Sequence, residues 1–252
     1  MGPPFAASYA GDVPITSETT DAVTVLTIDR THRRNALDLT TLEELHAAVV
    51  AAVGSGCRAL VLAGAEGHFC AGADLTELED VSFTERLAEV LQHLAGVPIT
   101  TVAAISGSCM GLGMQLAVAC DLRVVDTPAR FAVPVAKLGL MVDKWTLDRV
   151  ARCWGEGAAR HMVLTAAVLT EDDAWRLGFA QVRGGLDTAV DLARSAVPLA
   201  PLSQAGSKLG MGTAPGPDGD YSAAFARAWA SEDLVEGQRA FGERRTPTFV
   251  GR

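Results

Sequence analysis

Short apolar runs alternate with helix-like repeats along the first half of the chain. An alternation of polar and apolar positions over residues 21–28 predicts a strand. Continuous apolar runs at 58–63, 101–105 and 122–125 predict strands that are buried on both faces. Segments with helical spacing separate these runs, so this half predicts an α/β fold with a largely parallel sheet.

The second half of the chain predicts mostly helices. Helical spacing recurs over 146–153, 158–164, 171–177 and 190–199. Residues 201–220 are rich in glycine and proline, which predicts a loop, and one last helix is predicted over 221–242. We therefore expect a flexible leader at 1–20, a core at 21–200 and a C-terminal loop and helical extension at 201–252.

Composition narrows the classes of function. The formal net charge of -9 argues against nucleic acid as a partner, because phosphate binding needs a cationic face. Five cysteines without a CxxC pair predict buried thiols rather than disulfides or a metal site. No apolar run approaches the roughly 20 residues that cross a bilayer, and the first residues do not resemble an export signal. A cytoplasmic protein is the expectation.

Two glycine-rich segments follow predicted strands. His68–Asp74 comes after the strand that ends near Ala63, and Gly107–Gln115 comes after the strand that ends at Ile105. Small residues let the backbone turn where a strand gives way to a helix, and free N–H groups at a helix start can point at a ligand. Two such segments side by side could give two N–H donors to one oxygen, which is an oxyanion hole. Tight turns needed only for packing are the alternative interpretation.

The same two segments carry a family resemblance. FCAGAD at 69–74 and ISGSCMGLGMQLAVACD at 105–121 resemble the signature loops of the crotonase (enoyl-CoA hydratase/isomerase) superfamily. The segment 231–251, with SEDLVEG, AFGERR and PTFVG, is similar to that family's C-terminal helix. The resemblance covers about residues 21–252 in order. It implies a ββα spiral core and final helices that pack on neighbouring subunits in a trimer or dimer of trimers.

The resemblance also implies a site for a coenzyme A thioester, as ligand or substrate, with no other cofactor. By position, the backbone N–H groups of Ala71 and Leu112 are the oxyanion donors. Leucine stands where the family more often has glycine, and its side chain narrows the site. The residues assigned to CoA binding are Arg33, Arg34, Ala36, Ala71, Asp74 and Leu75. Guanidinium groups suit the CoA phosphates, but a solvated turn is the other interpretation of the two arginines.

Both catalytic glutamates of the family's hydratases are replaced. One position matches Gln115 and the other matches Val135. Glutamine can orient a water molecule but cannot take its proton, and valine can do neither. Each positioned acid or base contributes about 10²–10⁴ in rate, so we expect negligible hydration.

Asp143 is the nearest remaining carboxylate. Its position resembles an aspartate that does chemistry in some branches of the family, such as the aryl-CoA dehalogenases. The alternatives are an ion pair with Lys144 or Arg149, or a cap on the following helix. Trp145 is assigned to the wall of the acyl pocket or to the core.

The segments 113–117 and 142–145 also resemble an actinobacterial branch that lacks both glutamates. Members of that branch are thought to bind long acyl-CoA and to present it to fatty-acid or mycolic-acid machinery. The first hypothesis is therefore an acyl-CoA-binding protein of fatty-acid metabolism without hydratase activity, with fatty-acid synthesis proteins as partners. The second is an isomerase, hydrolase or dehalogenase-like enzyme that uses the oxyanion hole and Asp143.

Overall fold

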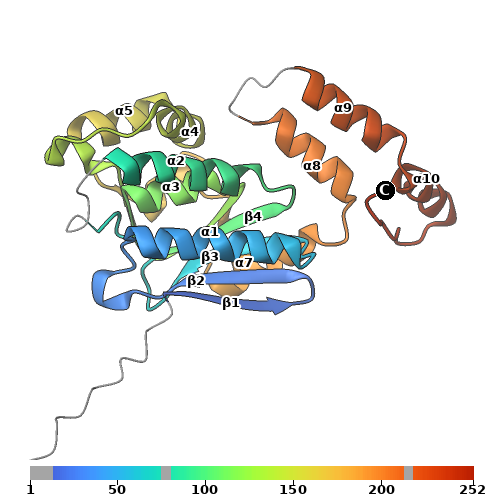
Figure 1. Ribbon diagram of the computed structural model, residues 1–252, viewed down its shortest axis with the longest axis horizontal. Helices are drawn as coiled ribbons and strands as arrows, with labels where there is room; N and C mark the ends of the chain where they lie inside the picture. Colours follow the sequence, from blue (N-terminus) through green and yellow to red (C-terminus); the bar gives the residue numbers. More distant parts are fainter. Residues whose placement is uncertain (1–13, 75–80, 213–217) are drawn as a thin grey trace, which may run out of the picture.

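A twisted mixed sheet forms the centre of the molecule (Figure 1). The computed structural model describes residues 14–74, 81–212 and 218–252. In this part of the chain the strand order is β1-β2-β3-β4-β5-β6, with β7 beside β5. The strands are β1 Ile15–Thr20, β2 Val23–Ile28, β3 Ala59–Gly64, β4 Thr100–Met110, β5 Leu122–Ala132, β6 Leu169–Thr170 and β7 Val182–Arg183. Strands β2 to β5 are parallel, as predicted, whereas β1 pairs antiparallel with β2.

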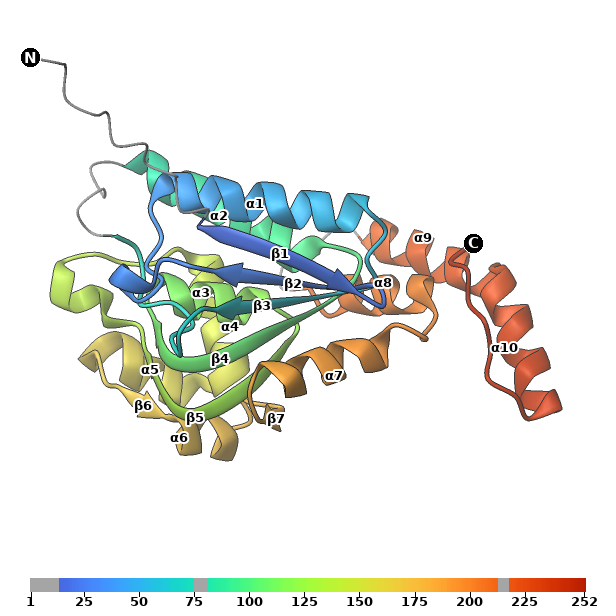
Figure 2. The ribbon, with the colours of Figure 1, turned by 90° about the horizontal axis from the view of Figure 1, so that it is seen from below.

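Helices cover both faces of this sheet. The bounds of the helices that follow the main strands are α1 Leu39–Gly54, α2 Val81–Gly96, α3 Leu112–Ala119 and α7 Leu186–Ala196. Figure 2 shows α1 and α2 on one side of the sheet and α7 on the other. Successive side chains of a strand point to opposite faces, so β3 contributes Leu60 and Leu62 to the larger core and Val61 to the core under α7.

The segment after β5 leads back over the end of the sheet. It comprises the 3₁₀ helix η2 Pro134–Leu138, then α4 Lys144–Trp154, α5 Glu156–Thr165 and α6 Glu171–Arg176. Trp154, Phe131 and Phe179 pack together here, with the Trp154 and Phe179 rings stacked at 4.2 Å between centroids. This aromatic cluster fixes α4 against β5, which matters for the site because α4 begins next to α3.

The leader prediction is wrong at its C-terminal end. Residues 15–20 form β1 and pair with β2 through the whole length of the strand, from Ile15 opposite Ile28 to Thr20 opposite Val23. β1 is exposed except at Ile15, and this polarity hid the strand in the sequence. An edge strand with one buried residue gives little hydrophobic signal.

The loop predicted over 201–220 is also wrong in part. Its first half is helix α8 Pro201–Gly210, and the last helix is two helices, α9 Asp218–Trp229 and α10 Glu232–Glu243. Proline is favourable in the first turn of a helix. A Cβ at Gly210 would lie 2.7 Å from the Tyr221 ring, so glycine here permits close packing of α8 on α9. Ser231 caps α10 by accepting from the Leu234 N–H, which separates it from α9.

The C-terminal arm, which consists of α8, α9, α10 and residues 244–252, projects from the core in both views (Figures 1 and 2). Lys208 Nζ on α8 joins it to the core through Asp121 at 2.8 Å and through the carbonyl oxygen of Ile99 at 3.0 Å. Among the described residues, no helix combines the length and apolar content that crossing a membrane requires.

Candidate functional site

The two glycine-rich segments lie side by side, as the oxyanion-hole hypothesis requires. The loop after β3 runs along the end of β4, and Cys70 pairs with Cys109 in a parallel bridge. The Cys70 N–H donates to the Ser108 carbonyl at 2.9 Å, and the Met110 N–H donates to the Cys70 carbonyl at 3.0 Å. β4 continues through a bulge to Met110, so the second segment is strand up to the start of α3 rather than loop.

Helix α3 begins where this strand ends. Gly111 has φ of 51°, a region that favours glycine, and it directs the chain into the helix at Leu112. As the first residue of the helix, Leu112 has an N–H without an intrahelical acceptor. A Cβ at Gly113 would lie 2.2 Å from the Cys70 carbonyl oxygen, so only glycine lets α3 pack this closely on the neighbouring loop. The Leu112 side chain is buried with the main core.

The structure contradicts Ala71 as the second donor. The Ala71 N–H donates to the Arg34 carbonyl at 3.0 Å and is therefore already occupied. Two residues later, Ala73 pairs with Leu37 in a parallel bridge. On either side of Ala73, the Leu37 N–H donates to the Gly72 carbonyl and the Asp74 N–H donates to the Leu37 carbonyl. In a parallel bridge of this kind, the N–H of the paired residue points away from the partner. The N–H of Ala73 therefore points away from Leu37.

The backbone around Ala73 lies close to the start of α3. A Cβ at Gly72 would lie 3.5 Å from the Met110 carbonyl oxygen, and one at Gly111 would lie 3.9 Å from Gly72 Cα. Ala73 and Leu112 thus bring two backbone donors to the same end of the sheet. Sequence reasoning missed Ala73 because the motif alone does not say which N–H groups the neighbouring strand occupies.

A turn after β2 supports the first of these loops. The turn contains the 3₁₀ helix η1 Thr31–Arg33, followed by Arg34 and Asn35 with positive φ. The buried Asn35 amide donates to the carbonyl oxygens of Ala65 and His68 at 2.9 and 2.6 Å. Arg30 bonds Asp38 at 2.6 Å and lies 3.7 Å from Asp74. These two anchors were missed, although an asparagine in a short polar segment after a predicted strand is a recognisable turn signal.

The residues assigned to CoA binding gather around this turn. Arg33 and Arg34 are exposed, and Arg33 Nε lies 3.8 Å from the buried carboxylate of Asp74. The Ala36 carbonyl accepts a hydrogen bond from Arg30 Nη1, so the backbone of Ala36 helps to hold the turn together. Leu75 lies outside the described residues. The arginines therefore flank the loop that carries Ala73, with one of them partly neutralised by Asp74.

Gln115 is held by a hydrogen-bonded chain that reaches α4. Its side-chain Nε2 donates to Thr146 Oγ1 at 3.1 Å, and Thr146 Oγ1 donates to Asp143 Oδ2 at 2.8 Å. Gln115 and Thr146 are both buried. Of these three hydrogen-bonded side chains, only the carboxylate of Asp143 can accept a proton from water at neutral pH.

Asp143 caps α4. Its Oδ1 accepts from the Thr146 backbone N–H at 3.0 Å, which is the arrangement of an N-cap residue. Lys144 pairs with Asp148 instead, and Arg149 Nε donates to the Val118 carbonyl. Of the interpretations open from the sequence, capping is the one that the structure contains.

Val135 and Trp145 are the last two residues that the sequence assigned to the site. Val135 lies in η2, half-buried against the main core, and its carbonyl accepts from the Leu140 N–H at 3.0 Å. Trp145 is half-buried as well, and the Arg149 guanidinium lies 4.9 Å from the centre of its ring. A cation over the ring face holds both side chains in place.

Cys70 beside the loop is not a nucleophile. The thiol is fully buried and donates to the Gly72 carbonyl at 3.5 Å. Burial raises the pKa of Cys70 to about 12, so the thiol stays protonated at neutral pH. Acyl transfer to cysteine is thereby excluded at this position.

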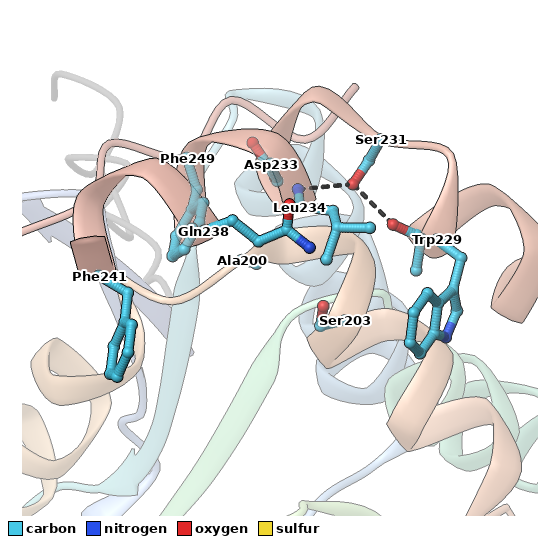
Figure 3. A pocket seen from close by; sticks show the side chains of 11 residues that line it. Ala200, Ser203, Trp229, Ser231, Asp233, Leu234, Gln238, Phe241 and Phe249 are labelled. Atoms are coloured by element: carbon cyan, nitrogen blue, oxygen red, sulfur yellow. Dashed lines mark hydrogen bonds between the residues drawn. The ribbon is translucent and has the colours of Figure 1, made fainter.

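Two grooves lie elsewhere, on the C-terminal arm. The larger has a volume of about 540 Å³ between α8, α10 and the end of the chain, and Figure 3 shows Trp229, Phe241 and Phe249 around it. The smaller, about 400 Å³, lies between α8 and the start of β4 and includes the Lys208–Asp121 ion pair. Neither contains a residue of the candidate site, which lies at the opposite ends of β3 and β4.

Comparison with known proteins decides the family. The sequence model of the enoyl-CoA hydratase/isomerase family matches residues 18–198. The chain belongs to this family. It is 39% identical over 242 residues to the probable enoyl-CoA hydratase echA6 of Mycobacterium tuberculosis, covering 92% of this chain and 98% of that protein. Methylglutaconyl-CoA hydratase of mouse mitochondria is 29% identical, over 91% of this chain and 80% of the relative.

Solved structures of the enoyl-CoA hydratase/isomerase family share its fold. A putative enoyl-CoA hydratase from Streptomyces coelicolor superimposes with a TM-score of 0.85 at 27% identity, and the match covers 100% of both chains. A putative family member from Hyphomonas neptunium gives 0.84 at 27% identity, over 95% of this chain and 98% of the other. The crotonase fold that the sequence resemblance implied is confirmed.

Proposed function

We propose that this protein binds a CoA thioester for fatty-acid or lipid metabolism and does not hydrate it. The observation that carries the proposal is the pair of backbone donors at Ala73 and Leu112, set beside a position where the hydratase glutamate is Gln115. Backbone donors polarise and hold a thioester oxygen without any side chain. Relatives named as CoA hydratases support a CoA thioester as the ligand.

The CoA moiety is assigned to the turn after β2. Arg34 is exposed and takes part in none of the ion pairs among the described residues, which leaves its guanidinium for a phosphate. Arg33 faces Asp74, so its net attraction for an anion is smaller. The loop from Ala71 to Asp74 lies directly against this turn, where it can contact the remainder of the cofactor.

Hydration is absent from the proposed activity for a chemical reason. Gln115 cannot accept a proton, and Val135 has no polar atom. The carboxylate of Asp143 is engaged by the backbone and hydroxyl of Thr146. These contacts weigh against the alternative of an isomerase, hydrolase or dehalogenase-like enzyme that uses Asp143 as base or nucleophile.

Assembly as a trimer or dimer of trimers is part of the proposal. The arm exposes large apolar side chains, with Phe241 88% exposed and Trp229 63% exposed. Apolar surface of this kind marks an interaction face. Subunits that bury it in closed symmetry would hold the arm in place. A cytoplasmic location and contact with fatty-acid synthesis proteins complete the proposed role.

A matched pair of variants tests the proposed site. Leu112→Pro removes the N–H donor at the first helical position, where proline is accepted, whereas Leu112→Ala keeps the donor and removes the side chain. In calorimetric titration with butyryl-CoA, we expect Leu112→Pro to bind about two- to tenfold more weakly than Leu112→Ala. Equal affinities would show that the Leu112 N–H does not bind the thioester oxygen. If the native protein had no affinity for any CoA thioester, the proposed function would be wrong.

A further inference from the structure

Helix α3 is buried along its whole length, so the polar groups at its C-terminal end must find partners inside the protein. The last carbonyl groups of a helix lack donors within the helix, and two arginines supply donors here. Arg123 Nη1 donates to the carbonyl oxygens of Ala117 and Cys120 at 3.3 and 3.1 Å. Arg149, on α4, approaches the same end of α3, where its Nε donates to the Val118 carbonyl at 2.6 Å.

Neither guanidinium forms an ion pair with a carboxylate in the part of the chain that the structure describes. Arg123 is 6% exposed, and its Nε donates to the carbonyl of Phe179, whose ring centre lies 5.0 Å from the guanidinium carbon. Arg149 is half-buried. The carboxylate of Asp121 acts on Arg149, but it is bonded to Lys208 at 2.8 Å, which balances its charge. Two positive charges therefore remain at this end of α3, in a chain whose net charge is -9.

Burying these two charges is costly. A neutral amide or hydroxyl could donate to the same carbonyl oxygens, whereas a buried cation without an anionic partner also loses its hydration. The negative end of the α3 dipole offsets part of this cost. Burial lowers the pKa of Arg149, and the nearby charge of Arg123 also lowers it, but a guanidinium stays protonated at neutral pH. Capping of α3 alone therefore does not account for the charge of the two side chains.

The opposite end of α3 carries the Leu112 donor of the candidate site. Leu112 and Val118 are separated by about 9 Å of helix, at a rise of 1.5 Å per residue. Inside the protein, positive charges at this range attract an oxygen that becomes partly negative when a thioester is polarised. They also compensate the negative end of the helix dipole, which would otherwise oppose that attraction.

We infer that Arg123 and Arg149 are positioning residues of the thioester site, which act through α3 and polarise the bound thioester more strongly than its backbone donors alone would. The inference rests on the proposed function, because it takes the Leu112 N–H as a donor to the thioester oxygen. Both arginines act from the far end of the helix, without touching the ligand. A role in capping alone would stabilise the fold and leave the bound thioester unchanged, so a measurement on the ligand separates the two roles.

The absorption band of a bound conjugated thioester reports its polarisation. Native protein is saturated with 2,4-hexadienoyl-CoA, the red shift of the thioester band from its position in free solution is recorded, and calorimetry gives the affinity. Arg149→Gln keeps an amide donor for the Val118 carbonyl and removes the charge. We expect this variant to lose roughly a third or more of the red shift and to bind about two- to tenfold more weakly. Arg149→Lys keeps the charge, and Arg152→Gln removes an exposed charge from the same helix, so both should keep the native shift.

Cys153→Asp provides a second route if Arg149→Gln does not fold, because it neutralises Arg149 without removing it. Cys153 is half-buried and follows Arg149 by four residues in α4, a spacing at which opposite charges pair. We expect Cys153→Asp to reduce the red shift by a similar fraction. Cys153→Asn, which has nearly the same shape without the charge, should keep the native shift.

A native red shift in folded Arg149→Gln or in folded Cys153→Asp would overturn the inference, because the arginines would then only cap α3. Equal losses in Arg149→Gln and in one of its controls, Arg149→Lys or Arg152→Gln, would overturn it as well. So would a native protein that binds 2,4-hexadienoyl-CoA without any red shift. All of these results leave the proposed function in place, whereas failure of the native protein to bind any CoA thioester would overturn the proposed function itself.

Discussion

The side-chain amide of Gln115 donates to the hydroxyl of Thr146 over 3.1 Å, which ties α3 to the first turn of α4. The family resemblance matches this position to a glutamate of the hydratases. Here the residue is turned toward a neighbouring helix and is part of a chain that ends on a capping aspartate. From this contact we predict that a carboxylate restored at this position alone would not restore hydration.

The double variant Gln115→Glu with Val135→Glu is predicted to recover only slight hydration of crotonyl-CoA. A carboxylate at 115 would compete with Asp143 for the single hydrogen of the Thr146 hydroxyl, so it would not be held as a catalytic base must be. Loss of the conjugated thioester absorbance measures the rate. Recovery by the full factor of about 10²–10⁴ for each carboxylate would show that the site is otherwise a complete hydratase.

Asp143 is predicted to act on stability rather than on chemistry. Asp143→Ala should lower the free energy of unfolding by about 0.5–2 kcal/mol, because the start of α4 loses its cap. Asp143→Asn is the control, since its one amide oxygen can still cap the Thr146 N–H, and in a denaturant titration it should lose clearly less stability than Asp143→Ala. A different result would support the enzyme alternative: measurable turnover of an acyl-CoA that Asp143→Asn lowers about a hundredfold or more.

His46 makes stability depend on pH. Arg86 Nη2 lies 2.8 Å from His46 Nδ1, and arginine can only donate, so this nitrogen accepts and the ring is neutral. Burial, then Arg86 and His93, lower the pKa of His46 below its ordinary value of 6.5. The unfolded chain therefore takes up the proton first as pH falls. The stability that neutral His46 contributes to the folded protein is fully present above pH 6.5. It is lost as the pH falls through 6.5 toward the lowered pKa.

Denaturant titrations of the native protein and of His46→Gln across pH 5 to 8 isolate this effect. Glutamine can accept from Arg86 and does not titrate. We expect the stability difference between the two proteins to shift against the native protein as the pH falls below about 6.5. A difference that stays constant across the range would show that His46 has the same pKa folded and unfolded.

The attachment of the C-terminal arm gives a prediction about dynamics. Lys208→Met removes the charge that binds Asp121 and the Ile99 carbonyl while keeping the aliphatic stem. We expect amide hydrogen exchange in α8 to become roughly tenfold faster. Arg227→Met is the control, because it removes an exposed positive charge from the same arm. If both variants exchange alike, the Lys208 ion pair does not hold the arm.

The fold was predictable where burial is strong. The apolar run at 58–63 became β3, and 122–125 became the first part of β5, because strands covered on both faces must be apolar throughout. β1 and α8 were missed for two different reasons. β1 is an exposed edge strand with a polar sequence, and α8 contains Gly206 and Gly210, which serve packing against α9 but are typical of loops.

The site was predictable in outline but not at every atom. Leu112 was placed by the family resemblance, and the structure gives a physical reason, since Gly111 ends the strand and makes Leu112 the first residue of α3. The donor in the other loop depended on which N–H groups were already bonded, and Arg34 occupies that of Ala71. That pairing belongs to the tertiary structure and leaves no mark on the motif. The cap made by Asp143 is local to the start of α4, and it was already among the interpretations open from the sequence.

The central claim is binding without hydration, and one titration tests it directly. Crotonyl-CoA is added to the native protein in a calorimeter, and the absorbance of the conjugated thioester is followed in the same mixture. We predict a saturable heat of binding, with an absorbance that stays at the level of a protein-free sample over hours. Loss of that absorbance with formation of 3-hydroxybutyryl-CoA would contradict the account, as would the absence of any saturable heat.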